Sequence, residues 1–327
     1  MASLVWLVVL SFPDNKLHVV FCNVGQGDAA LIFKGFNQIL IDGGPNDKVL
    51  ECLANNMPIT DKKIEMVIMT HPEADHMTGL VSVLEKYEVS YFLSGPEGNR
   101  SAIYSKLISI LTSRHPGKRS QIPDSIWRSA SRIGFWASQN DGVKVINPYF
   151  GDRIKLGDII LETLWPEKEW LASKIQDCDI EDYTLENCST ESNQTTIIGA
   201  NTDSRAILGA KTGETHLNDF SLIFLLRYNG KTVLFMGDAD QRVDNRMIGL
   251  QELVNSLNGI DILKFPHHGS KTGITEKLLE EINPRQVVIS VGKNSFGHPT
   301  KEALDMLEKF NVIIRRTDIE GDIKYEF

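Results

Sequence analysis

The stretch "MTHPEADHMTGL", residues 69–80, follows the apolar run "KIEMVI" and carries the pattern H-x-E-x-D-H. His71, Glu73, Asp75 and His76 thus place four polar side chains within six positions. Imidazole and carboxylate groups are both ligands of divalent transition metals. The alternative is a surface turn or helix N-terminus in which Asp75 accepts backbone N–H groups. The density of ligand types favours a metal site.

Further polar residues also follow apolar, strand-like runs. Asp238 follows "TVLFM", His267 and His268 follow "IDILKFP", His298 lies in "GHP", and Asp42 ends "LIDGG". A carboxylate at a buried strand end is unfavourable unless it is paired or metal-bound, although loop capping is the alternative for both aspartates. Adjacent side chains on an extended segment point to opposite faces, so only one of His267 and His268 is expected to be a ligand. Asp42 is expected to orient a ligand histidine, and His298 is either a cleft residue or a structural one. Loops at strand ends converge, so these residues predict one site.

The composition is that of a soluble globular protein. The chain has 327 residues, of which 42% are hydrophobic and 24% charged. Its net charge of −9 argues against a broad nucleic-acid-binding face. A small phosphate-binding cleft remains compatible with this charge, because bound metal ions would supply local positive charge.

Four cysteines lack the paired C-x-x-C spacing of a structural zinc site. Cys22 lies in an apolar run and is expected to be a small buried hydrophobic residue. Cys178 and Cys188 share one polar stretch and would form either a disulfide or two free thiols. The apolar run "LVWLVVLSF" at residues 4–12 is too short to span a bilayer. It would be an edge strand or the end of a membrane helix.

Runs of strands alternate with helices twice along the chain, which predicts an αββα sandwich in a single α/β (α+β) domain. The domain is expected at residues 17–327, after an apolar N-terminal segment at residues 1–16. Hairpins are predicted around Gly157-Asp158 and Asn229-Gly230, and a helix from Met77. Insertions are expected near residues 99–136, helical and basic, and near residues 168–217, a polar loop. The basic residues of the first insertion would form a solvated face or a nucleic-acid contact: Arg114, Lys118, Arg119, Arg128 and Arg132.

The order of these motifs resembles that of the metallo-β-lactamase fold superfamily: Asp-Gly-Gly, then H-x-E-x-D-H, then Gly-Asp and a later histidine. Longer phrases are similar to the C-terminal metallohydrolase domain of the ComEC family of competence DNA-uptake proteins. They include "NVGQGDAALI", "NDFSLIFLLRYNGKTVLFMGDAD", "LKFPHHGSKTG", "SVGKNSFGHP" and "RRTDIEGDI". The resemblance covers nearly all the chain from about Leu17, apart from the two insertions.

The resemblance implies an αββα fold with one or two divalent metal ions. The implied ligands are His71, Glu73, Asp75, His76, Asp238 and either His267 or His268, with Asp238 bridging. Asn218 stands where many superfamily members carry a third-motif histidine. Glu73 and Asn218 enrich the site in oxygen donors, which favours Mn²⁺ while leaving Zn²⁺ or Mg²⁺ as alternatives.

The resemblance implies a metal-dependent nuclease that degrades the DNA strand that is not transported. Asp75 would accept the proton of the nucleophile, and Lys264, Lys271 or His298 would neutralise the phosphate. Two alternatives are a small-molecule phosphodiesterase or lactonase, and a non-catalytic domain of a channel. The expected partners are single-stranded DNA and membrane-channel segments of a competence protein, without an organic cofactor. The expected location is the extracytoplasmic face of a bacterial membrane.

Overall fold

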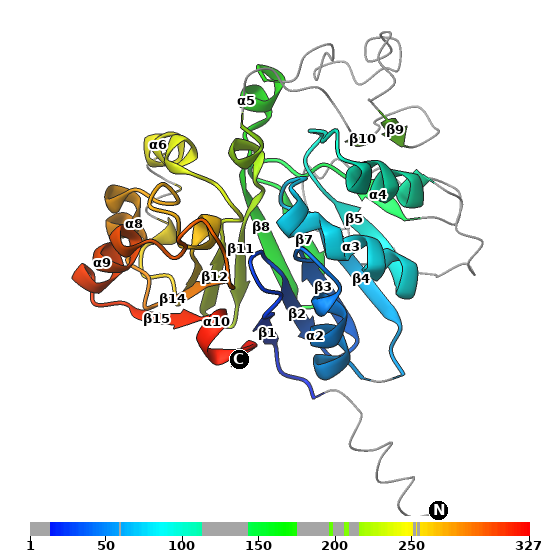
Figure 1. Cartoon of the computed structure of the whole chain (residues 1–327), viewed down its shortest axis with the longest axis horizontal. Helices are drawn as coiled ribbons and strands as arrows, with labels where there is room; N and C mark the ends of the chain where they lie inside the picture. Colours follow the sequence, from blue (N-terminus) through cyan, green and yellow to red (C-terminus); the bar gives the residue numbers. More distant parts are fainter. Residues whose placement is uncertain are drawn as a thin grey trace, which may run out of the picture.

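The computed structural model describes residues 14–58, 60–112, 143–174, 196–198, 206–208, 216–250, 253 and 256–327. These residues form two seven-stranded sheets packed face to face, with helices on the outer faces (Figure 1). The predicted αββα sandwich is therefore confirmed. The apolar segment at residues 4–12, the predicted basic cluster, and Cys178 and Cys188 lie outside the described residues.

The first sheet begins with antiparallel strands and ends with parallel ones. Its first four strands pair antiparallel, and β3 to β6 pair parallel. In spatial order the strands are β16 (Ile323–Glu326), β1 (His18–Phe21), β2 (Ala30–Lys34), β3 (Asn37–Ile41), β4 (Lys63–Ile68), β5 (Glu88–Leu93) and β6 (Lys144–Ile146).

The second sheet repeats this plan. Strands β7, β8, β11 and β12 pair antiparallel, and β12 to β15 pair parallel. In spatial order the strands are β15 (Ile313–Arg316), β14 (Gln286–Ile289), β13 (Ile262–Lys264), β12 (Lys231–Phe235), β11 (Ile223–Tyr228), β8 (Ile159–Trp165) and β7 (Arg153–Leu156). A separate pair, β9 (Thr196–Ile198) and β10 (Ala206–Leu208), lies within the predicted polar insertion.

Helices cover the outer face of each sheet (Figure 1). Those on the first sheet are α2 (Lys48–Asn56), α3 (Ala74–Lys86) and α4 (Ala102–Thr112). Those on the second sheet are α6 (Gln241–Gly249), α8 (Glu276–Ile282) and α9 (Lys301–Lys309). Shorter helical segments are α5 (Lys168–Ala172), α10 (Thr317–Glu320), η2 (Leu217–Phe220) and η3 (Pro266–Gly269). No helix among the described residues combines the length and apolar character needed to cross a bilayer.

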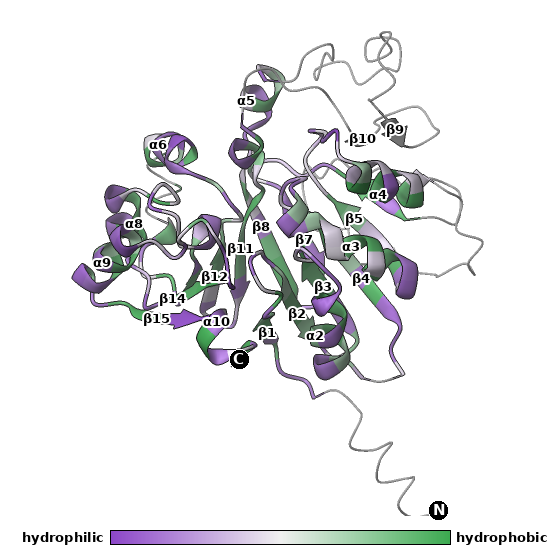
Figure 2. Ribbon diagram, in the orientation of Figure 1, coloured by the Kyte–Doolittle hydropathy of each residue, from purple (hydrophilic) through white to green (hydrophobic). Residues whose placement is uncertain are grey.

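The core consists of three apolar layers because strand side chains alternate between the two faces. In β3, Ile39 and Ile41 point between the sheets, whereas Leu40 points to the outer helices. Figure 2 shows hydrophobic residues along the strands and hydrophilic ones on the outer surfaces of the helices. Helix α4 contributes Tyr104 and Leu107 to the same outer layer as α2 and α3, so the first part of the predicted insertion belongs to the sandwich.

Both predicted hairpins are confirmed. Strands β7 and β8 are joined at Gly157-Asp158, and β11 and β12 at Asn229-Gly230. Asn229 and Gly230 have φ values of 47° and 76°, and this left-handed pair matches the right-handed twist of the flanking strands.

The expectation for Cys22 needs a correction. Cys22 is fully buried, as predicted, but it forms a disulfide with Cys52 of α2. The two Cα atoms lie 5.8 Å apart across a sequence separation of 30 residues. The bond ties the chain after β1 to the helical layer. Sequence spacing could not reveal it, because only folding brings the two residues together.

Candidate metal centre

The candidate site lies where parallel strands of both sheets end. Asp42 follows β3 and His71 follows β4 in the first sheet, while Asp238 follows β12 and His268 follows β13 in the second. The carboxyl ends of parallel strands share one edge of a sheet, and the packing of the two sheets brings both edges together. Fold topology therefore gathers residues that are far apart in the sequence.

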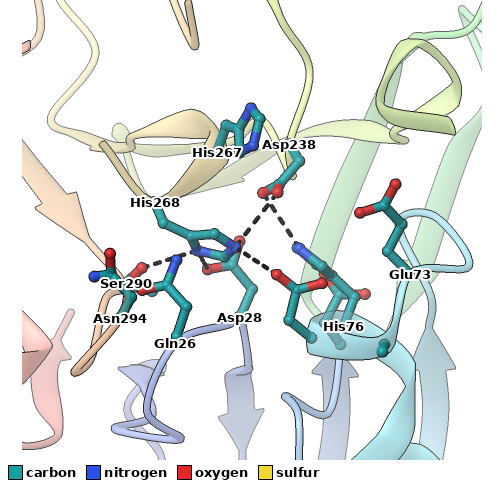
Figure 3. A network of polar contacts seen from close by, with 12 residues as sticks. Gln26, Asp28, Glu73, His76, Asp238, His267, His268, Ser290 and Asn294 are labelled. Carbon is teal, nitrogen blue, oxygen red and sulfur yellow. Dashed lines mark hydrogen bonds and ion pairs between the residues drawn. The ribbon is translucent and has the colours of Figure 1, made fainter. Parts of the chain in front are cut away.

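Four side chains form a compact group of potential ligands, and three of them, His76, Asp238 and His268, are labelled in Figure 3. One ligand atom from each of Asp75, His76, Asp238 and His268 lies within 4.8 Å of the others. Asp238 contacts His76 Nε2 at 3.3 Å and His268 Nε2 at 3.4 Å through its two oxygens. Asp75 Oδ2 lies 3.3 Å from His268 Nε2. Asp238 and both histidines are buried, whereas the Asp75 side chain is 31% exposed and gives the group an opening to solvent.

The ring of His76 is fixed from behind by Asp42. His76 Nδ1 donates to Asp42 Oδ2 at 2.8 Å, and Thr70 donates to the two oxygens of Asp42 from its backbone N and its hydroxyl. With Nδ1 bonded to Asp42, Nε2 is the ring nitrogen that faces Asp238. The structure therefore gives Asp42 the orienting position expected from the sequence.

His268 is fixed in the same way by different partners. Its Nδ1 donates to the backbone oxygen of Ser290 at 3.0 Å and lies 3.4 Å from Asp28 Oδ1. Asp28 is held in turn by Lys264, whose Nζ lies 2.7 Å from Asp28 Oδ2. Both members of this ion pair are buried, so solvent ions screen the attraction between the two charges only weakly.

His71 and Glu73 lie beside this group. The Thr70 hydroxyl donates its one proton to Asp42, so at 3.1 Å it acts as an acceptor for His71 Nδ1. Ser221 Oγ lies 3.3 Å from the same nitrogen. His71 Nε2 then presents a lone pair, with Glu73 Oε2 at 4.0 Å.

The arrangement fits a divalent cation. His71 Nε2 is buried without a hydrogen-bond partner, and His76 Nε2 and Asp238 Oδ1, which lie 3.3 Å apart as an ion pair, make no hydrogen bond of good geometry. Buried polar atoms are normally satisfied, and these three are nitrogen and oxygen donors of the kind that Mn²⁺ and Zn²⁺ accept.

The protonation of the histidines supports this fit. Burial lowers the pKa of His71 to about 3, so its ring is neutral. Burial also lowers the pKa of His268, but the Asp238 and Asp28 carboxylates outweigh it and raise the pKa to about 10. Burial also lowers the pKa of His76, but the Asp238 and Asp42 carboxylates outweigh it and raise this pKa well above its usual value. Two imidazole protons thus balance the carboxylates, and a divalent cation is the partner that would replace them.

The adjacent residues His267 and His268 occupy different positions relative to the four-residue group. His268 joins the four-residue group, whereas the His267 ring lies near Asn218 Nδ2, at 3.5 Å, and near the ring of His298. The segment is not extended as assumed, because both histidines have left-handed φ values, 49° and 53°. One histidine of the pair faces the group, as expected, but for a different geometric reason.

The three groups predicted to neutralise a phosphate differ in their surroundings. Lys264 is 3% exposed, pairs with Asp28 and donates to the Phe265 backbone oxygen at 2.8 Å, so its role is to hold Asp28 in place. Burial, followed by the charges of His267 and His268, lowers the pKa of His298, which makes its ring neutral at pH 7. Lys271 is exposed and lies outside the four-residue group.

Helix α3 begins at Ala74, with Glu73 at its N-cap position, three residues before the predicted start at Met77. Asp75 and His76 therefore sit on the first turn of the helix. The Glu73 side chain makes no capping hydrogen bond and is 39% exposed. The stretch therefore lies at a helix N-terminus, as in the alternative interpretation, while the contact given for the Asp75 side chain is with His268 Nε2.

Several positioning residues were missed from the sequence: Asp28, Thr70, Ser221 and Ser290. Only Asp28 carried a signal, since "GQGD" places an aspartate directly after a glycine turn. Thr70 and Ser221 contribute single hydroxyl groups and Ser290 contributes only its backbone oxygen, and sequence patterns do not distinguish these from ordinary polar residues.

No family model matches the chain. Over 113 residues the chain is 32% identical to ComE operon protein 3 of Bacillus subtilis, covering 34% of this chain and 14% of that protein. Over 111 residues it is 29% identical to Recombination protein 2 of Haemophilus influenzae, covering 34% of this chain and 13% of that protein. The matched segment is thus a small part of these relatives.

Solved structures resemble the whole chain. The metallo-beta-lactamase fold protein YhfI from Bacillus subtilis aligns with a TM-score of 0.50 and 13% identity, covering 95% of this chain and 100% of that chain. CmlA, a diiron beta-hydroxylase from Streptomyces venezuelae, aligns with a TM-score of 0.50 and 11% identity, covering 96% and 55%. These likenesses show that the chain has the metallo-β-lactamase fold. The chain is also 27% identical over 112 residues to Competence protein ComA of Neisseria gonorrhoeae, covering 33% of this chain and 15% of that protein. The two resemblances expected from the sequence, in fold and to competence proteins, are confirmed.

Proposed function

We propose that this chain is a metal-dependent hydrolase that cleaves phosphodiester bonds of DNA during competence. The observation that carries the proposal is the group of Asp75, His76, Asp238 and His268, with His71 and Glu73 beside it. The sequence similarity to competence proteins supports DNA as the substrate.

The six residues would hold one or two cations. Bound there, divalent cations would lower the pKa of a water nucleophile and neutralise charge on the phosphoryl oxygens. We favour Mn²⁺ because the set contains three carboxylates, which are oxygen donors, beside three histidines.

The protein residues contribute orientation and access. Asp42, Asp28 and Ser290 hold the rings of His76 and His268 so that both Nε2 atoms face Asp238. Asp75 is ionised, because hydrogen bonding from His268 and the charge of His76 outweigh burial and lower its pKa to about 2. Being partly exposed, it is placed to accept a hydrogen bond from the attacking water.

Two observations support a proposed location. The Cys22–Cys52 disulfide is typical of proteins in oxidising compartments, and the relatives are competence proteins. We therefore place the domain on the extracytoplasmic face of a bacterial membrane, as part of a DNA-uptake protein.

The test uses purified protein stripped of metal and reloaded with Mn²⁺, Mg²⁺ or Zn²⁺. Labelled single- and double-stranded DNA are offered beside bis(p-nitrophenyl) phosphate, a small phosphodiester. Asp75→Ala and Asp238→Ala are expected to abolish cleavage of all substrates. Asp305→Ala, which removes an exposed carboxylate on α9, is the matched control and should retain activity.

Each other outcome has a clear meaning. Cleavage of the small phosphodiester without cleavage of DNA would replace the DNA substrate with a small molecule. Cleavage that survives Asp238→Ala, or no cleavage with any of the three ions, would refute the proposed hydrolase.

A further inference from the structure

The loop between β14 and α9 presents an aromatic side chain to solvent beside the candidate metal centre. We propose that Phe296, together with His298, is a stacking platform for a nucleobase of the substrate strand. The proposal rests on the proposed function, since it assigns how the same site would hold a nucleic acid.

Phe296 is exposed to an unusual degree. Its exposure is 72%, the highest of any large apolar side chain among the described residues. A phenylalanine ring is normally buried. Its exposure is informative here because of where the loop holds it.

The loop is fixed by one side chain. Asn294 donates to the backbone oxygens of Gly292 and His298, both at 2.8 Å. Its oxygen accepts from the backbone N of Phe296 and of His298, both at 3.0 Å. Gly297 completes the turn with a φ of 78° that favours glycine. The exposed ring is therefore carried on a backbone that is already ordered, which lowers the entropy lost on binding.

The same loop is attached to the metal-centre residues at both ends. At its start, the backbone oxygen of Ser290 accepts from His268 (Figure 3). At its end, Thr300 donates its backbone N to the oxygen of Gly269, the residue after His268, at 2.9 Å. The position of Phe296 is thus coupled to that of a proposed ligand.

A series of rings runs from solvent to the metal centre. The Phe296 and His298 centroids lie 5.9 Å apart at an interplanar angle of 32°. His298 lies 5.5 Å from His267, which lies 6.3 Å from His268. A base that stacks on Phe296 would enter this series at its exposed end.

The surroundings favour a nucleobase over an apolar ligand. Phe296 is a single ring, flanked by polar Asn294 and His298, with exposed Lys293 in the same loop. A flat heterocycle attached to a phosphate matches one aromatic face beside one cation. Stacking on an aromatic side chain is tolerant of base identity, so the platform would serve a nuclease without sequence preference.

The test measures binding separately from cleavage. Manganese-loaded protein is titrated into two fluorescein-labelled phosphorothioate strands, which resist hydrolysis: one carries thymine bases and the other is abasic. Phe296→Ala is expected to weaken binding of the thymine strand roughly tenfold or more and to leave the abasic strand unchanged. Phe296→Trp should retain binding. Phe36→Ala is the matched control, because Phe36 is 53% exposed at the end of β3 opposite to Asp42.

Hydrolysis of bis(p-nitrophenyl) phosphate by the unmodified protein is the second readout, because it reports on the metal centre separately from binding of a DNA strand. Equal weakening on both strands, or no weakening on either, would overturn the platform. Failure of the unmodified protein to bind either strand would also overturn it, while retained hydrolysis of the small phosphodiester would show that the hydrolase proposal stands separately.

Discussion

Replacing Asp28 by asparagine tests how the site is held together. Asp28 is 5% exposed, and its two oxygens face Lys264 Nζ at 2.7 Å and His268 Nδ1 at 3.4 Å. Burial raises the pKa of Asp28, but the charges of Lys264 and His268 outweigh it and lower the pKa below its usual value. The carboxylate is therefore ionised, and the amide keeps its shape while removing its charge.

Two effects of different size follow. Removing one partner of a buried ion pair leaves Lys264 uncompensated, which costs about 3–5 kcal/mol of unfolding free energy. The bond from Lys264 to the Phe265 backbone oxygen remains, so we expect the lower end of this range. Loss of an orienting partner lowers metal affinity by about 10- to 100-fold. Since the Ser290 oxygen still holds His268, we expect about tenfold, or roughly 1.4 kcal/mol.

Urea denaturation in the presence of a chelator measures the first effect, and calorimetric titration with Mn²⁺ measures the second. The double variant Asp28→Asn with Lys264→Met removes the uncompensated charge and should recover most of the stability but not the metal affinity. Asp158→Asn breaks an exposed pair with Lys34 and should change neither quantity. Unchanged metal affinity in Asp28→Asn would refute the orienting role, and a double variant as unstable as the single one would refute the ion-pair argument.

Three further predictions concern Glu97, the Cys22–Cys52 disulfide and Glu73. Burial raises the pKa of Glu97 to about 8 from an ordinary 4.5. Its contribution to the unfolding free energy is therefore fully present below pH 4.5 and is lost as the pH rises to about 8, at about 1.4 kcal/mol per pH unit. The unfolding free energy of Glu97→Gln should decline less across this range than that of the unmodified protein, and an equal decline would contradict the assignment. Replacing Cys22 and Cys52 by alanine should lower the unfolding free energy by roughly 3–4 kcal/mol, because the bond closes a loop of about 30 residues; reduction of the unmodified protein should reproduce the loss in denaturation experiments. Glu73→His should shift the relative affinity of the site from Mn²⁺ toward Zn²⁺ in competition titrations, whereas an unchanged preference would place Glu73 outside the coordination sphere.

The fold was predictable because its signals are local. Alternation of apolar residues marks the strands, and the Asn229-Gly230 turn marks a hairpin that the structure contains. Ligand types concentrated between His71 and His76 pointed to the site for the same reason. The start of α3 was placed too late because Asp75 and His76 are polar, and an apolar pattern does not begin until Met77.

The remaining features depend on contacts between distant segments. The Cys22–Cys52 bond joins a strand end to a helix, and neither residue carries a spacing motif. Asp28 lies in a glycine-rich turn, where an aspartate is ordinarily a surface residue. Its burial arises only because β13 brings Lys264 and His268 against it. Which of His267 and His268 faces the group depends on the left-handed backbone of the turn, and the residue types at these positions do not predict that conformation.

The division of the ligands between the two sheets has a consequence for when the centre can form. Asp75 and His76 follow the first sheet's β4, and Asp238 and His268 follow strands of the second. Neither half of the chain holds the complete set, so a growing polypeptide cannot capture the ion until its second half has been made and docked. If these residues bind a divalent cation as proposed, it would be bound only after both halves have folded, and its removal would weaken the contact between the two sheets.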